Sequence, residues 1–507
     1  MILENGTVRT LDASLPTAGA LAIAGDRVAG GIGTHETALA SPEVVDLGGR
    51  CVLPGITDSH VHFPTWAAAR RVIRLEEATS AEDAAARLAP GVEGVAPGRW
   101  FRALGFRETN WPELPTKEVL DAVTGDIPAA VISKDSHAIW LNSAGIARTG
   151  GDLRRYDVRG GVVELGPDGE PTGLIREESA WRFKEEHLEL TDEEYLEALR
   201  EGLKVASSRG VTAIHDKDGW IPSIPRLWQE LEREDALPVR VWQSVPHENV
   251  DRLAEVGLAS GLGDRVRLGY LKVFMDGTLG SQTALMTDGS GVEITSREEL
   301  IDILRRAARA RWPVAVHAIG DLANRNALDA FEQTRDEWQP PGLRHRVEHA
   351  QCLRPEDVSR FAELGLTASV QFSHAPSDEE LAHRFWSDRL DGAYSFRSLL
   401  ERRTRLVNGS DAPIEELDPW GGIVAGVLRH WRPDERVTVE EAIRASTVEP
   451  AWLTGDERRR GKLLPGYVAD LVVLDRDPFA IEAEELPEVQ VVATMVGGRW
   501  THNAPPW

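Results

Sequence analysis

The sequence predicts an α/β protein: a (β/α)8 barrel of the TIM type, flanked by a small β-sandwich domain that both chain ends form. Two observations support this prediction. The middle of the 507-residue chain alternates apolar runs of strand length with helical stretches. Such alternation indicates a parallel sheet, which closes into a barrel at about eight units. Both ends instead consist of short apolar runs separated by glycine turns.

The two ends share one pattern. Residues 1–54 contain three apolar stretches with turn signals at Gly25-Asp26 and Gly48-Gly49, and the segment after Gly461 again shows strands with glycine turns. The economical inference is that residues 1–54 and 455–507 pack together as one composite β-sandwich domain. Residues 55–454 then form the catalytic barrel domain.

Barrel strands are expected where an apolar run precedes a helical stretch. Three helices carry a capping-box signature, with Glu three residues after Thr191, Ser296 and Thr438. A doubly wound open sheet is the alternative, but its glycine-rich phosphate fingerprint is missing. The strand candidates are residues 55–62, 128–133, 210–216, 239–245, 266–276, 313–320, 343–351, 366–372 and 404–413.

An insertion is expected between the first and second barrel strands, at residues 65–126. This span is too long for an ordinary connection, and it contains a strand-like run of its own at residues 99–106. We therefore expect a separate unit there rather than a plain βα connection.

Composition restricts the partners. The chain carries 57 Lys and Arg against 82 Asp and Glu, a net charge of −25, which disfavours nucleic acid and anionic lipid. The sequence shows neither a signal peptide nor a membrane span. Its two cysteines, Cys51 and Cys352, provide no disulfide framework. We expect a cytoplasmic protein with a small-molecule substrate and no nucleic-acid or membrane partner, and leave a homodimer open.

The first signal of a site is the segment GITDSHVH. Strand side chains alternate between faces, so His60 and His62 point the same way, with Asp58 one step deeper. At the C-terminal end of a barrel strand, two such imidazoles can chelate one metal ion. The alternative is a pair of solvated histidines at a strand end.

Further polar residues fall late in other strands. His317, His349 and Asp411 each end an apolar run, and Lys272 interrupts one. Taken singly, each is better explained as a satisfied core histidine or a salt bridge. Taken together, they favour one dication site, because a buried lysine or aspartate needs a compensating group.

With these motifs, the chain resembles the amidohydrolase superfamily, specifically amidohydrolase family 3 and the subgroup typified by N-substituted formamide deformylase. The resemblance covers essentially the whole chain. It implies the metal-dependent hydrolase fold. The matching segments are residues 53–63, 210–216, 271–284, 314–321, 343–351, 408–413 and 466–475.

The resemblance implies a role for each residue of the set. His60 and His62 would hold the more buried metal, and His317 and His349 the second. Lys272 would be carboxylated by carbon dioxide and bridge the two. Asp411 would bind metal and exchange a proton with the attacking water. Two zinc ions are the default for nitrogen and oxygen ligands, with manganese, iron or cobalt as alternatives.

The implied reaction is hydrolysis of a non-peptide C–N bond in an amide, an N-substituted formamide or a carbamate, by a metal-activated hydroxide. A mononuclear deaminase or cyclic-imide hydrolase of the same fold is the first alternative, because such relatives dispense with the bridging role of Lys272. A catalytically inactive scaffold barrel is the second.

Substrate contacts are expected from the segment DSHAIWLNS. His137, Trp140 and Asn142 follow a strand candidate and are predicted to line the mouth of the barrel. The alternative for His137 is a surface loop. Where many relatives have proline after Gln371, this chain has Phe372, which leaves the shape of the substrate loop open.

Overall fold

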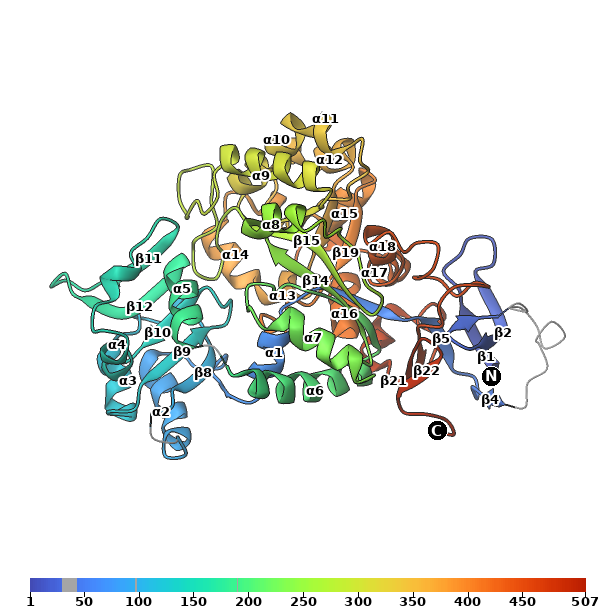
Figure 1. Cartoon of the computed structure of the whole chain (residues 1–507), viewed down its shortest axis with the longest axis horizontal. Coiled ribbons are helices and arrows are strands. Elements are labelled where there is room, and N and C mark those ends of the chain that lie inside the picture. Colours follow the sequence, from blue (N-terminus) through green and yellow to red (C-terminus); the bar gives the residue numbers. More distant parts are fainter. Residues whose placement is uncertain (30–42, 96–97, 189) are drawn as a thin grey trace.

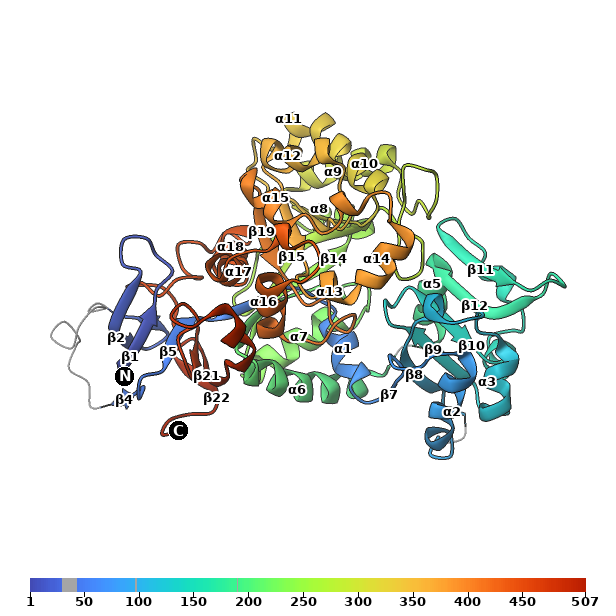
Figure 2. The same ribbon diagram turned by 180° about the vertical axis from the view of Figure 1, so that it is seen from behind.

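The computed structural model describes residues 1–29, 43–95, 98–188 and 190–507. The chain forms three parts (Figure 1). The barrel lies in the middle, a module inserted into it lies on one side, and a β-sheet built from both chain ends lies on the other. The view from behind shows both termini at the same end of the molecule (Figure 2). No helix in the described ranges is long and apolar enough to cross a membrane.

The barrel is a parallel sheet of eight strands that follow one another in chain order. Two backbone hydrogen bonds join the end of the first strand to the chain just after the last strand: Asp411 N donates to His60 O at 2.7 Å, and His62 N donates to Ala412 O at 2.9 Å. Gly409 permits this approach, because a Cβ there would lie 2.4 Å from His60 N. The barrel is therefore nearly closed. Its strands are β6 (Ile56–Val61), β13 (Val211–Asp216), β14 (Arg240–Pro246), β15 (Val266–Phe274), β16 (Val314–Ala318), β17 (Arg346–His349), β18 (Thr367–Val370) and β19 (Arg405–Asn408).

Helices cover the outside of the barrel. The capping boxes predicted at Thr191, Ser296 and Thr438 are present, with reciprocal side-chain and backbone hydrogen bonds to the Glu three residues later. They begin α6 (Asp192–Ser208), α9 (Arg297–Ala310) and α17 (Val439–Ala445). Each satisfies backbone N–H groups that a helix start leaves unpaired. The three starts were thus correctly predicted from the sequence.

The inserted module is larger than the predicted span of 65–126. Its six-stranded sheet has the order β11-β12-β10-β9-β8-β7 and continues to Glu177, followed by α5 (Glu178–His187). The run 128–133, expected as a barrel strand, is β9 of this sheet. An apolar run beside a helix looks the same locally whichever sheet it joins. The strands are β7 (Ile73–Arg74), β8 (Phe101–Phe106), β9 (Ala129–Ser133), β10 (Ala138–Leu141), β11 (Gly161–Leu165) and β12 (Pro171–Glu177).

The two chain ends form one mixed sheet. β20 (Leu471–Leu474) pairs antiparallel with β5 (Cys51–Pro54), so the last strands continue the sheet of the first. The pairing joins eight strands from both ends into one hydrogen-bonded sheet, and the two-layered sandwich stays a prediction. The other strands are β1 (Ile2–Arg9), β2 (Thr17–Ala24), β3 (Arg27–Val28), β4 (Val44–Asp46), β21 (Val491–Val496) and β22 (Arg499–His502).

Candidate metal centre

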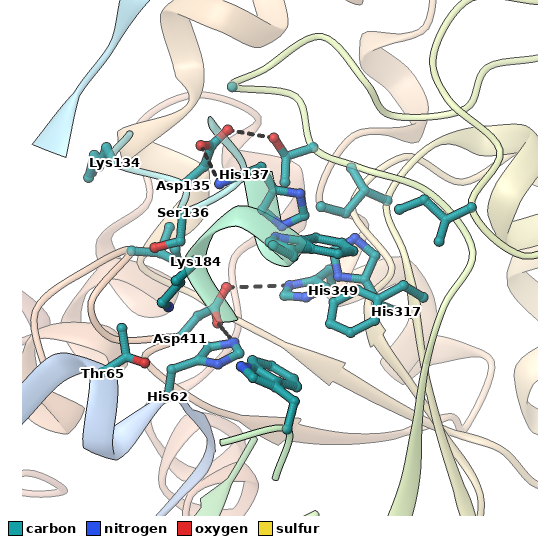
Figure 3. Close-up of a pocket in the computed structure, with 18 of the residues that line it drawn as sticks. His62, Thr65, Lys134, Asp135, Ser136, His137, Lys184, His317, His349 and Asp411 are labelled. Carbon is teal, nitrogen blue, oxygen red and sulfur yellow. Dashed lines mark hydrogen bonds and ion pairs between the residues drawn. The ribbon is translucent and has the colours of Figure 1, made fainter. Parts of the chain in front are cut away.

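A cavity of about 490 Å³ opens at the C-terminal ends of the barrel strands. This is the end at which barrel enzymes place their active sites. One wall comes from the inserted module, including Asp135 and His137, and the floor comes from the barrel. Figure 3 shows Asp411 between His62 and His349, with His317 beside them. Predicted ligands that line the cavity are His62, Lys272, His317, His349 and Asp411.

His60 and His62 both turn one ring nitrogen toward Asp411. His60 is buried, and its Nε2 lies 3.3 Å from Asp411 Oδ1, while the Nε2 of His62 lies 3.5 Å from the same oxygen. The Nδ1 atoms face carboxylates, Glu348 at 2.7 Å and Asp218 at 2.8 Å. A carboxylate accepts, so each Nδ1 carries the proton and each Nε2 keeps a lone pair for a metal ion.

His317 and His349 also each have one ring nitrogen that faces an oxygen acceptor. His317 Nε2 lies 3.1 Å from the carbonyl oxygen of Gly277, and His349 Nδ1 lies 2.9 Å from Gln371 Oε1. Both partners are acceptors, so the other nitrogen of each ring is left with a lone pair. The two rings are 4.5 Å apart between centroids. These four histidines therefore each offer one unprotonated nitrogen.

Lys272 and Asp411 are buried in the same site. Burial, helped by the nearby Arg346, lowers the pKa of Lys272 to about 8, although Glu348 and Asp411 act to raise it. Burial also raises the pKa of Asp411 well above its usual value, against the cations Lys272 and His137. The lysine is thus more easily neutral than a surface lysine, which carboxylation of its amine requires.

The buried atoms fit a divalent cation. Within the described ranges, His60 Nε2, Lys272 Nζ and Asp411 Oδ1 are buried without a hydrogen-bond partner. Leaving such groups unpaired costs several kcal/mol each. Ligand atoms of His60, His349 and Asp411 all lie within 4.8 Å of one another, and His62 extends this set through Asp411. Imidazole and carboxylate ligands suit zinc, manganese, iron or cobalt.

A charged network behind His60 was not predicted from the sequence. Glu348 is fully buried and faces His60, Lys217 Nζ at 2.9 Å and Arg346 Nη2 at 2.9 Å. Strand alternation places Arg346 and Glu348 on one face, yet His349 also reaches the site because its φ of 72° turns the chain there. Two charged residues spaced i, i+2 in a buried strand are a signal that sequence inspection could have used.

His137 lies at the cavity, as the sequence predicted, but Trp140 and Asn142 of the same segment do not. His137 lines the cavity from the inserted module, with Nδ1 2.6 Å from Glu177 Oε2 and its ring 5.8 Å from that of His317. Trp140 is instead buried in the core of the module, 6.0 Å from Trp111 between ring centroids.

The prediction for Asn142 was also wrong. Its Oδ1 accepts hydrogen bonds from Gly145 N at 2.7 Å and Ala129 N at 2.8 Å, so it caps α4 (Ser143–Arg148). Neither Trp140 nor Asn142 lines the cavity. The physical reason is that β10 leads away from the barrel into the sheet of the module, so only the residue before that strand stays at the mouth.

Aromatic side chains form part of the cavity wall. Trp181 of α5 lies 4.9 Å from Phe274 between ring centroids, and Trp220 lies 5.9 Å from the same ring. Trp220 also lies 5.2 Å from His62. All three rings line the cavity. The wall beside the predicted ligands is therefore apolar on one side.

Known proteins resemble the chain over nearly its whole length. It is 30% identical over 98% of its length to the protein LONG AFTER FAR-RED 3 of Arabidopsis thaliana, of which it covers 91%. It is 27% identical over 98% of its length to N-substituted formamide deformylase of Arthrobacter pascens, of which it covers 97%. A solved structure, an uncharacterized metal-dependent hydrolase from Pyrococcus horikoshii, matches with a TM-score of 0.77 and 29% identity, covering 95% of this chain and 99% of that one.

The family assignment rests on the length of the match as well as on the site. The model of the amidohydrolase family matches residues 43–502, which include the barrel, the inserted module and part of the terminal sheet. The barrel is that of a metal-dependent hydrolase, and it holds the histidines and the aspartate together at the expected end. The chain therefore belongs to the amidohydrolase family.

Proposed function

We propose that the protein hydrolyses a non-peptide C–N bond of a small molecule, using divalent metal held by His60, His62, Lys272, His317, His349 and Asp411. The observation that carries this proposal is the convergence of unpaired buried atoms from His60, Lys272 and Asp411 beneath one cavity. A bound dication would polarise a carbonyl and lower the pKa of a water molecule toward neutrality.

Asp411 is placed to handle the proton in this reaction. Its carboxylate is buried, lies beside His60 and His62, and belongs to the cavity lining. As the oxygen of water bonds to the carbonyl carbon, Asp411 takes the proton that the water loses. As the C–N bond breaks, Asp411 gives that proton to the leaving nitrogen, because an amide anion is a very poor leaving group.

The number of metal ions depends on Lys272. Its amine is buried and has no hydrogen-bond partner among the described residues, and burial lowers its pKa to about 8. A carboxylated Lys272 would offer two further oxygen ligands in the same site as the four histidines, which favours two metal ions, zinc by default. An unmodified lysine would favour the mononuclear alternative.

The cavity and one relative support the proposed substrate class. The cavity has the size of a small-molecule site, with the rings of Trp181 and Phe274 on one wall and His137 on another. The deformylase among the relatives is named for N-substituted formamides. We propose an amide, formamide or carbamate that bears an apolar group, with His137 contacting the substrate.

A hydrolysis screen tests the proposal. The metal-loaded protein is incubated with N-acyl, N-formyl and carbamate compounds, and released amine is measured before and after treatment with a chelator. We expect hydrolysis of at least one class, abolished by the chelator and restored by zinc. Hydrolysis that persists in the fully chelated protein, or no turnover across all three classes, would reject the proposed function.

A further inference from the structure

One more histidine lies in the site. His374 follows β18 and begins the short helix α13 (His374–Ser377). It is buried, lines the cavity and stacks parallel to His349, with 6.2 Å between ring centroids and 9° between planes. Its Nε2 lies 3.7 Å from Asp411 Oδ2 and has no hydrogen-bond partner among the described residues. No prediction from the sequence included it.

His374 differs from the four predicted metal ligands in what holds its other nitrogen. Those four histidines each have a ring nitrogen facing an oxygen acceptor, from Glu348, Asp218, Gly277 or Gln371. The Nδ1 of His374 instead faces the amide nitrogen of Gln351 at 3.0 Å. An amide nitrogen can only donate.

The consequence is the opposite tautomer. With the amide nitrogen of Gln351 donating to Nδ1, this nitrogen is the unprotonated one, and the proton of the neutral ring sits on Nε2. A reversed amide would turn the unpaired Oε1 of Gln351 toward the ring and give the other tautomer, so the tautomer is measured directly below. A nitrogen that carries a proton cannot ligate a metal ion, but it can donate a hydrogen bond into the cavity beside Asp411.

We propose that His374 is a catalytic residue whose Nε2–H donates a hydrogen bond to the carbonyl oxygen of the substrate, and that Gln351 positions it by fixing the tautomer. The role rests on the proposed hydrolysis. Negative charge grows on that oxygen when water adds to the carbonyl carbon, and a fixed donor in a water-poor site stabilises the charge more than it stabilises the substrate.

The test compares two substitutions of similar length. His374→Met removes the donor, whereas His374→Gln places an amide N–H near the position of Nε2. Metal content, kcat and KM are measured for both, with an N-substituted formamide as substrate. We expect full metal content in both, a fall in kcat of about 10²–10³-fold for His374→Met with little change in KM, and substantial recovery of kcat in His374→Gln.

Several outcomes would overturn the inference. Loss of metal from His374→Met would make His374 a ligand, and an unchanged kcat, or a glutamine variant no better than methionine, would remove the donor role. The tautomer is measured independently in the wild-type protein by ¹⁵N NMR of labelled histidine, and a proton on Nδ1 would contradict the argument whether or not the variants fold. A wild-type protein inactive on every amide would instead reject the proposed function.

Discussion

Replacing Glu348 with Gln tests the network that holds His60. The carboxylate lies 2.7 Å from His60 Nδ1, 2.9 Å from Lys217 Nζ and 2.8 Å from Arg346 Nε, and all four side chains are at most 1% exposed. Glu348→Gln keeps the shape but removes the negative charge. Two buried cations, Lys217 and Arg346, then lose their counter-ion, and His60 keeps only an amide oxygen as acceptor.

The magnitude can be worked from the two cations. Burial and the nearby Arg346 already lower the pKa of Lys217 to about 7, against Glu348, which raises it. In the variant this pKa falls further, so Lys217 becomes neutral at little cost. Arg346 cannot deprotonate, and an uncompensated buried charge costs about 3–5 kcal/mol. Because Lys217 loses its proton, only Arg346 remains charged, and we expect the free energy of unfolding to fall by the lower end of this range, about 3 kcal/mol. Loss of the carboxylate that orients the metal ligand His60 also weakens metal affinity by about 10–100-fold.

The assay combines urea denaturation of the metal-free protein with calorimetric titration of zinc. Glu356→Gln is the matched control, because Glu356 pairs with Arg325 on the surface, with its side chain 52% exposed. For that control we expect the free energy of unfolding to fall by less than about 1 kcal/mol and the zinc affinity to stay unchanged. If Glu348→Gln unfolded with the wild-type free energy and bound zinc with the wild-type affinity, the network would have no role in holding His60.

Three further predictions concern single side chains. Asp411→Asn should keep its metal but lose about 10²–10⁴-fold in kcat, as metal analysis and kinetics will show; near-wild-type kcat would remove Asp411 as the base. Lys272→Met should lower the metal content measured by mass spectrometry, and an unchanged content would exclude a bridging role. Trp140→Ala should destabilise the inserted module by about 3–5 kcal/mol in thermal or urea unfolding without changing KM, whereas a raised KM would return Trp140 to the substrate site.

The barrel was predictable because its signals are local. Apolar runs followed by capped helices repeat along the chain, and the polar residues that end them come together once the sheet closes. The boundary of the inserted module was not predictable in the same way. β9 is a buried apolar strand like those of the barrel, and only its pairing with β8 and β10 reveals which sheet it joins.

In the site, too, residues with a local sequence signal were predictable, and residues placed by contacts between distant segments were not. His60, His62, His317, His349 and Asp411 were predicted as candidate ligands from their places at strand ends, and the structure places them next to one another. The partners that orient them were missed because contacts between distant segments decide them: Lys217 reaches Glu348 across 131 positions of sequence. His374 was missed for a related reason, since it follows a turn beyond its strand rather than ending it.

The metal content of the purified protein tests the central claim most directly. The chain is saturated with zinc, dialysed, and analysed by mass spectrometry beside His60→Ala treated in the same way. We predict about two zinc ions per wild-type chain, as expected for a two-metal site, and a clear loss in the variant. A wild-type chain that retains no divalent metal after dialysis against trace zinc, manganese, iron or cobalt would contradict a metal-dependent hydrolase built on these residues.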